Sequence, residues 1–166
     1  MACLAAGPTP EVAIPAALAT LGDGLGAART YLFENDPDPA ALPRTCSLRH
    51  EWTGLGVASM VAVAGFDHAV YEDLVPGLAA RLSAGEAVFV ELAQSTEDLR
   101  ELHTDAPAAC FLLSPVQVQG RFWGFVGFDW LTVRRSSDET RAALNVLATA
   151  VGAVLGAHRA SRLLHA

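Results

Sequence analysis

Lysine is absent from this 166-residue chain, so arginine and histidine are its only basic side chains. The arginines are scattered, with only Arg134 and Arg135 adjacent, and the formal net charge is −7 at pH 7. A surface that binds nucleic acid needs a basic patch or stripe. We therefore expect no nucleic-acid partner.

Cysteine is scarce as well, and its positions do not form a metal-binding pattern. Cys3, Cys46 and Cys110 are far apart in the sequence and odd in number, so we expect reduced thiols, no metal site and a cytoplasmic compartment. The N-terminus lacks the basic region and long apolar core of a secretory signal. No run of about 18 uninterrupted apolar residues occurs, so we expect no membrane association.

The most informative stretch runs from Ala108 to Asp129 and predicts two apolar strands joined by a tight turn at Gln119-Gly120. Both arms are nearly continuous in apolar residues, which is typical of strands buried on both faces at the centre of a sheet. Gly124 and Gly127 interrupt the second arm. A glycine within a strand indicates close approach of another group, such as another backbone, a large neighbouring ring, a ligand or the terminal helix.

The remaining periodicities predict helices around this hairpin and further strands before it. The 45–52 strand alternates so that Cys46, Leu48, His50 and Trp52 share one face. The segment 53–66 lacks a clear period and is assigned to a loop. The other predicted elements are a helix at 10–21, a strand at 29–33, a helix at 68–84 with a possible division at Pro76, a strand at 87–93, a brief helix ending near 103 and a long helix from about 138. This order predicts the α+β class with a mostly antiparallel sheet.

Five segments, taken in order, resemble one known family. They are Arg29–Asn35 (RTYLFEN), Leu48–Thr53 (LRHEWT), Leu112–Val116 (LLSPV), Gly120–Asp129 (GRFWGFVGFD) and the closing helix Leu144–Arg159. In this order and spacing they resemble a GAF domain of the bacterial signalling type, as found ahead of sensor kinases and diguanylate cyclases.

This resemblance implies a single GAF domain over residues 1–166, with its core at about 11–160. Its central antiparallel sheet would have five to six strands, with the terminal helices on one face and a ligand pocket under helices and loops on the other. Candidate residues for binding a small-molecule ligand are Trp52, Phe66, His68, Tyr71, Phe89, His103, Cys110, Leu112 and Phe125.

The resemblance also implies how such a domain would signal. The helix at 138–160 would extend into a dimerising or linker helix, and the expected partners are a second copy of the chain and a histidine kinase or cyclase output domain, fused or separate. We expect a non-catalytic sensor in signal transduction, such as a two-component system.

Several alternatives stay open at this stage. The aromatic side chains would equally fill a core without a ligand, leaving a structural or dimerising domain. Some GAF domains bind haem through a histidine, for which His68 and His103 are candidates, although an exposed or hydrogen-bonded role explains them as well. Bilin attachment needs a cysteine, and the motifs that accompany it are absent. A sulfoxide reductase would need two neighbouring thiols, for which Cys46 and Cys110 are the internal candidates.

Overall fold

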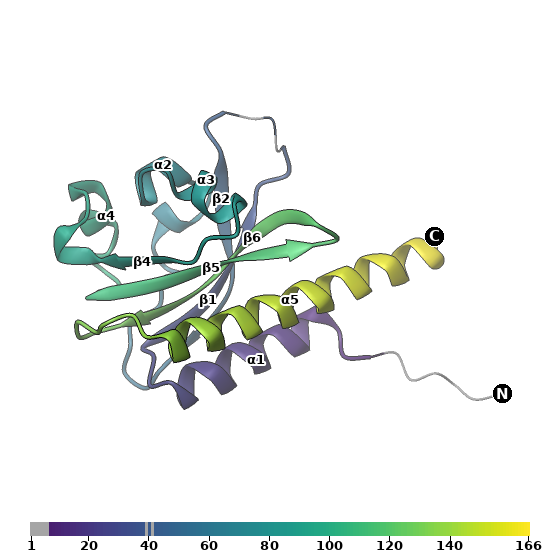
Figure 1. Ribbon diagram of the computed structural model, residues 1–166, viewed down its shortest axis with the longest axis horizontal. Coiled ribbons are helices and arrows are strands. Elements are labelled where there is room, and N and C mark those ends of the chain that lie inside the picture. The colour runs from purple at the N-terminus through teal and green to yellow at the C-terminus, as the bar shows by residue number, and fades with distance from the viewer. Residues whose placement is uncertain (1–6, 39, 41) are drawn as a thin grey trace.

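The computed structural model describes residues 7–38, 40 and 42–166. Its strands are β1 (Arg29–Asn35), β2 (Thr45–Thr53), β3 (Ala69–Val70), β4 (Val88–Glu91), β5 (Cys110–Val118) and β6 (Arg121–Trp130). They form one sheet in the order β3-β2-β1-β6-β5-β4, and every neighbouring pair is antiparallel (Figure 1). The predicted α+β class and the expected five to six strands are confirmed.

The predicted central hairpin is present as β5 and β6. Gln119 and Gly120 connect the strands with φ angles of 52° and 76°, the two positive values that a two-residue type I′ turn requires. Because β6 also pairs with β1, and β5 with β4, both arms are interior strands. Hydrophobic residues can therefore occupy both faces of the hairpin.

The two glycines of β6 allow close approach of the neighbouring strand β1. A Cβ atom at Gly124 would collide with the backbone carbonyl oxygen of Phe33, and one at Gly127 would collide with the ring of Tyr31. Both neighbours belong to β1, the adjacent strand. Of the predicted alternatives, the structure shows approach of another backbone at Gly124 and of a large ring at Gly127.

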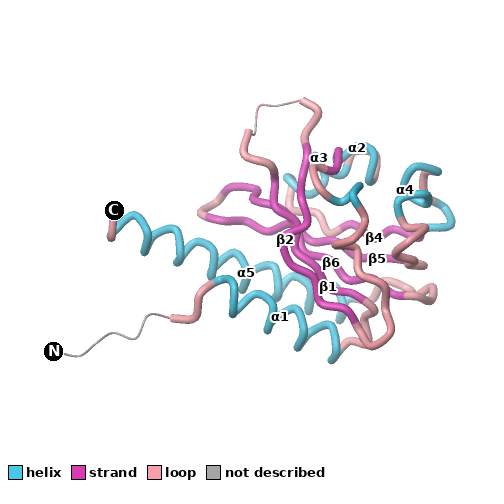
Figure 2. The backbone as a smooth tube through the Cα atoms, turned by 180° about the vertical axis from the view of Figure 1, so that it is seen from behind, coloured by secondary structure: helices cyan, strands magenta, loops and turns pink. Residues whose placement is uncertain are grey.

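The first and last helices, α1 (Pro10–Gly24) and α5 (Asp138–Leu164), lie side by side on one face of the sheet (Figures 1 and 2). This confirms the predicted position of the terminal helices. They bury one apolar stripe each, and the core that they close contains Ile14, Leu18, Leu32, Leu112, Val126, Phe128, Leu144, Leu147 and Val151. In α5, Gly152 lies directly against the sheet, because a Cβ atom there would collide with the carbonyl oxygen of Gln117.

Within the described residues, α5 is long and apolar enough to cross a membrane by length and composition, with 27 residues and a mean hydropathy of 1.4 over an 18-residue window. Leu144, Leu147 and Val151 of this helix are nevertheless buried against the sheet. The core helix of a globular fold passes the same test, and we interpret α5 in that way. Its last turns project beyond the sheet (Figure 2).

Short elements cover the other face: η1 (Ala64–Phe66), α2 (Tyr71–Leu74), α3 (Leu78–Ser83), η2 (Leu92–Gln94) and α4 (Glu97–Leu102). The helix predicted at 68–84 is divided into α2 and α3 around Pro76, because proline cannot continue the helical hydrogen-bond pattern. It also begins later than predicted, since β3 precedes α2. Gly85, with φ at 86°, follows the end of α3.

The strand β2 contains an irregularity that reverses its faces. Leu32 pairs with His50, whereas Phe33 pairs with Leu48, so Arg49 is an extra residue that forms a β-bulge. Leu48 therefore packs toward the short helices, while Trp52 packs in the core under α1 and α5. The prediction of one continuous apolar face for this strand was wrong.

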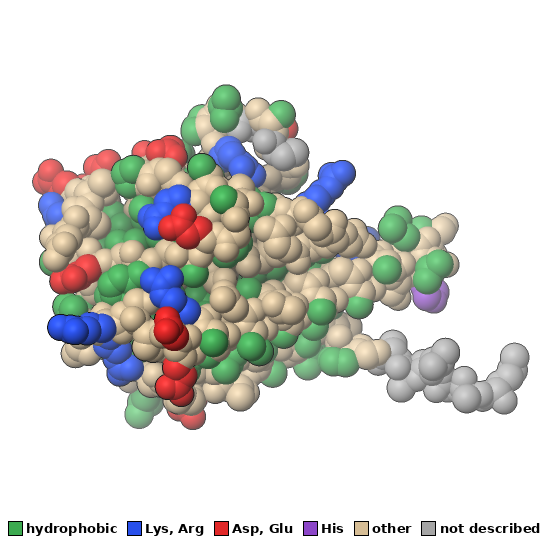
Figure 3. All heavy atoms as spheres, in the orientation of Figure 1, with side chains coloured by type: hydrophobic (Ala, Val, Ile, Leu, Met, Phe, Trp, Pro, Cys, Tyr) green, Lys and Arg blue, Asp and Glu red, His purple; other side chains and the backbone are tan. Residues whose placement is uncertain are grey.

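Charged side chains are mixed on the surface. On the face shown in Figure 3, arginine and acidic side chains alternate over the body of the protein. Among the described residues, Arg49–Glu34 and Arg81–Glu86 form ion pairs at the surface with N–O distances of 2.9 and 2.6 Å. This distribution agrees with the expectation of no basic stripe on that face.

Candidate functional site

A small cavity lies between the sheet and the short helices. Its volume is about 30 Å³, enough for one or two water molecules. The sheet contributes the side chains of Tyr31, Phe33, Phe111, Leu113 and Phe125 to the wall, and the covering segments contribute Met60, Phe66, Leu74, Val75, Leu78, Leu99 and His103.

Aromatic rings fix the shape of this cavity. Phe33 and Phe125 stack with their ring centroids 4.8 Å apart and their planes 9° from parallel. Phe66 meets Phe33 edge-on at 6.1 Å, and Tyr71 packs on Phe125 at 5.9 Å. Such offset and edge-to-face contacts are the favourable arrangements for aromatic pairs, so the wall is well ordered on the sheet side.

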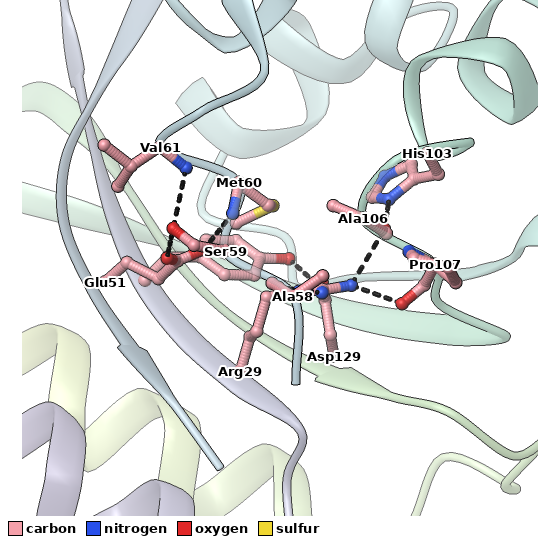
Figure 4. Close-up of polar contacts among 11 residues, drawn as sticks. Arg29, Glu51, Ala58, Ser59, Met60, Val61, His103, Ala106, Pro107 and Asp129 are labelled. Atoms are coloured by element: carbon pink, nitrogen blue, oxygen red, sulfur yellow. Dashed lines mark hydrogen bonds and ion pairs between the residues drawn. The ribbon is translucent and has the colours of Figure 1, made fainter. Parts of the chain in front are cut away.

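A fully buried ion pair lies beside the cavity (Figure 4). The Nε atom of Arg29 lies 2.9 Å from Oδ2 of Asp129, and both side chains have no exposed surface. The hydroxyl of Tyr31 donates to Oδ1 of the same carboxylate at 2.7 Å. The carboxylate is thus neutralised and hydrogen-bonded through both oxygens, as a buried charge requires.

The other nitrogens of Arg29 hold the cover in place. Nη1 donates to the carbonyl oxygen of Ala58 at 2.7 Å. Nη2 donates to the carbonyl oxygen of Ala106 at 3.0 Å and to that of Pro107 (Figure 4). A single side chain from β1 therefore ties two separate covering segments, 54–63 and 103–109, to the sheet.

Glu51 gives the first covering segment a second attachment. Its carboxylate accepts a hydrogen bond from the backbone nitrogen of Met60 at 2.8 Å and another from the hydroxyl of Ser59. Met60 is buried and lines the cavity. The loop predicted at 53–66 is therefore largely irregular, as expected, but it is held at defined points.

His103 is the buried histidine of the site, with 6% of its surface exposed. Its Nδ1 lies 3.1 Å from the carbonyl oxygen of Ala106; because a carbonyl only accepts, Nδ1 carries the proton and donates. Burial lowers the pKa of His103, so the ring is neutral and its Nε2 is an acceptor. The ring stacks on Phe111 at 5.8 Å and meets Phe66 edge-on at 5.5 Å.

His68 lies outside the cavity, contrary to its prediction as a pocket residue. Its side chain is 70% exposed, and its Nδ1 lies 3.0 Å from Oδ2 of Asp36. The hydrogen bond with Asp36, followed by the charge of that carboxylate, raises the pKa of His68. The exposed, hydrogen-bonded role is therefore the correct one for this histidine.

Apart from His68, the predicted pocket residues fall into two groups. Phe66, His103 and Phe125 line the cavity, and Tyr71 packs in the same core directly beside it. Four others were placed on the wrong face and pack in the core under α1 and α5, namely Trp52, Phe89, Cys110 and Leu112.

Strand geometry explains these errors. Neighbouring residues of a strand point to opposite faces, and in β5 it is Phe111 and Leu113 that face the cavity, so Cys110 and Leu112 cannot. Phe89 pairs directly with Leu112 and shares its face. For Trp52, the bulge at Arg49 changes the face.

The sequence interpretation missed the polar part of the site. Arg29 and Asp129 entered the sequence analysis only as ends of predicted strand segments, although they form the buried ion pair. The sequence did contain a sign of this pair. Arg29 begins one apolar strand, and Asp129, of opposite charge, lies near the end of another apolar strand. In an antiparallel pair such ends meet, and Arg29 does pair with Asp129 in the β1–β6 register.

The two internal cysteines lie far from one another. Cys46 is on β2 in the cavity-side core, and Cys110 is on β5 in the opposite core. Three strand spacings of about 4.8 Å separate these strands, which is too far for a disulfide. Burial raises the pKa of the Cys46 thiol to about 12 and also raises that of Cys110. Cys3 lies outside the described residues.

The model of the GAF domain family matches residues 9–155. The chain belongs to the GAF domain family. The Methanogenesis regulatory histidine kinase FilI of Methanothrix harundinacea (strain 6Ac) is 27% identical over 145 residues, which are 87% of this chain and 16% of that kinase. This chain therefore spans a small part of the length of that relative.

Solved GAF domains share the fold. GAF3 from Slr1393 of Synechocystis sp. PCC6803, in its photoproduct state, has a TM-score of 0.79 at 15% identity, covering 95% of this chain and 100% of that one. A domain assigned to a two-component sensor histidine kinase of Sinorhizobium meliloti 1021 has a TM-score of 0.71 at 18% identity, covering 96% and 99%. These similarities show that the chain has the GAF fold.

The cavity of this GAF domain does not fit a haem or a bilin in the arrangement described. Pockets for cofactors and drug-sized ligands measure roughly 300–1,000 Å³, whereas this cavity measures about 30 Å³. No cysteine within residues 7–38, 40 and 42–166 lines it, and those residues contain no cluster of three or more potential metal ligands.

Proposed function

We propose that this GAF domain is a non-catalytic regulatory sensor that binds a small molecule in the aromatic cavity and signals through its terminal helices. The observation that carries the proposal is the aromatic cavity between the sheet and the short helices, whose cover is fastened to the sheet at a few defined points. The kinship with sensor histidine kinases supports the regulatory role.

The cover has a thin section through which a ligand would enter. An outer groove of about 490 Å³ lies between α2, α4 and the edge strand β4. Leu74, Val75 and Leu99 line both this groove and the inner cavity. Rotation of these side chains, with a small displacement of α2 or α4, would join the two spaces and enlarge the cavity to the size of a small metabolite.

A change at the cavity has a short path to the terminal helices. Asp129 holds Arg29 and Tyr31 through its side chain, and its backbone oxygen accepts a hydrogen bond from Ala28 at 2.7 Å. Ala28 belongs to the connection between α1 and β1, and β6 continues through residues 131–137 into α5. Movement of the ion pair would therefore act on both helices.

We further propose a homodimer formed by the terminal helices of this cytoplasmic domain, with a kinase output domain as partner, as the similarity to FilI suggests. Val12 of α1 and Val146 of α5 are 64% and 65% exposed, and Leu164 at the end of α5 is 85% exposed. Sedimentation of the protein should reveal a dimer that Val146→Arg weakens. A strict monomer at high concentration would remove the dimer from the proposal.

Hydrogen–deuterium exchange during a screen of small metabolites tests ligand binding. A ligand in the cavity should slow exchange in residues 54–63 and 97–109, with no equal effect in α1. Leu99→Ala shortens a side chain in the thin section of the cover. This variant should therefore reveal ligands that enter the wild-type cavity too slowly to be detected.

The competing functions predict other results. If no compound binds either the wild type or Leu99→Ala, the structural, dimerising role is the better explanation. The separation of Cys46 and Cys110 speaks against a sulfoxide reductase. Thiol-dependent turnover of methionine sulfoxide that is lost in Cys46→Ser would contradict our proposal.

A further inference from the structure

His103, which lines the cavity, has one ring nitrogen without a hydrogen-bond partner among the described residues. Among the lining side chains of the described chain, Tyr31 and His103 carry a nitrogen or oxygen atom. The hydroxyl of Tyr31 donates to Asp129, and Nδ1–H of His103 donates to Ala106. Within the described residues, Nε2 of His103 has no hydrogen-bond partner, and the remaining heteroatom, the sulfur of Met60, is a weak acceptor.

We propose that the cavity selects small, neutral, mostly apolar molecules with one O–H or N–H donor, which Nε2 of His103 accepts. This inference rests on the sensor function proposed above and specifies the chemical class of its ligand. His103 becomes the residue that determines specificity, and the aromatic wall provides the contact area.

The acceptor role follows from the hydrogen bond on the other side of the ring. Nδ1 of His103 is held as a donor by the carbonyl oxygen of Ala106, so Nε2 of the neutral ring presents a lone pair. Contacts with Phe111 and Phe66 on two sides prevent the ring from turning away. A ligand that offers only acceptors would place two lone pairs against each other.

The charges beside the cavity favour a neutral ligand. Arg29 and Asp129 already neutralise one another, and the nitrogens of Arg29 are occupied by Asp129 and by backbone carbonyl groups. An added anion or cation would lose its hydration without a free counter-charge, which is costly in a buried site. The cavity walls are otherwise apolar, so the rest of the ligand should be apolar too.

Phenol and anisole are suitable probes because they share an aromatic ring and differ in the O–H donor. Their affinities would be measured by calorimetric titration or ligand-observed NMR with the wild type, His103→Phe, His103→Gln and Leu99→Ala. We expect the wild type to bind phenol roughly tenfold more tightly than anisole, the effect of one buried hydrogen bond. His103→Phe, which keeps an aromatic ring, should reduce this ratio to about onefold, while His103→Gln should retain part of it.

The outcomes separate this inference from the sensor function. Equal binding of phenol and anisole to the wild type would overturn the role of His103 and leave the sensor function in place. A preference for phenol that persists in His103→Phe would do the same. If neither probe binds the wild type or Leu99→Ala, and the metabolite screen is also negative, the sensor function fails together with the inference. The wild-type comparison needs no substitution, so it remains decisive if a variant does not fold.

Discussion

Helices of 15 and 27 residues, α1 and α5, cover one face of the sheet, whereas helices of four and six residues, joined by loops, cover the other. The first face is closed mainly by apolar stripes of two long helices, with a hydrogen bond of 2.8 Å between Ser114 of β5 and Asn145 of α5. The second face contains the cavity, the buried ion pair and His103. This difference indicates that α1 and α5 provide stability, while the other face allows local opening of the kind that ligand entry requires.

The largest expected effect concerns the ion pair that holds the cover. Asp129→Ala leaves Arg29 buried without its counter-charge, so we expect a loss of about 3–5 kcal/mol in the free energy of unfolding. Urea denaturation at pH 7 measures this loss. Glu34→Ala is the control, because it removes an exposed partner of Arg49 and should cost at most about 1 kcal/mol. Similar losses for both variants would contradict the importance that we assign to the buried pair.

The helix-covered face offers a second test. Gly152→Ala places a Cβ atom against the backbone of Gln117 and must displace α5, so we expect it to cost about 1–3 kcal/mol. Gly156→Ala lies one turn later, where the nearest atom is 4.0 Å away, and it should stabilise the helix by about 0.5–1 kcal/mol. Thermal unfolding of both variants measures the two changes in stability. A neutral Gly152→Ala would show that the helix does not lie as tightly on the sheet as described.

The fold could be predicted from the sequence because its main signals are local. The apolar arms of the hairpin and the glycine turn at Gln119-Gly120 determine the central strands, and the stripe through Leu144, Leu147 and Val151 determines the closing helix. These patterns depend on neighbouring residues alone, and the order of the matching segments indicated the family.

The candidate site was less predictable, since it depends on which face each strand presents. An error of one residue in β5 moves Cys110 and Leu112 to the wrong core, and the bulge at Arg49 does the same for Trp52. The pairing of Arg29 with Asp129 joins residues 100 positions apart. No local pattern contains that contact, although two opposite charges in apolar strands were a usable sign of it.

The smallest expected effect comes from two histidines, one in the cavity wall and one at the surface. Burial lowers the pKa of His103, whereas an unfolded histidine has a pKa of about 6.5. The unfolded chain therefore takes up a proton first as the pH falls. The free energy of unfolding should therefore decrease as the pH falls from about 6.5 toward the pKa of His103 in the folded protein. His103→Phe should make this decrease smaller in unfolding measurements between pH 5 and 8.

His68 should act in the opposite direction. Its hydrogen bond with Asp36 raises the pKa of His68, so its stabilising contribution is complete below about pH 6.5 and is lost as the pH rises through the folded-state value. His68→Asn tests this, because asparagine tolerates the positive φ of 53° at that position. His68→Asn should lower the free energy of unfolding more at pH 5 than at pH 8. The difference between the two pH values should be smaller than the one that His103→Phe removes, because the side chain of His68 is exposed. Equal effects at both pH values would mean that the contact with Asp36 does not depend on the charge of His68.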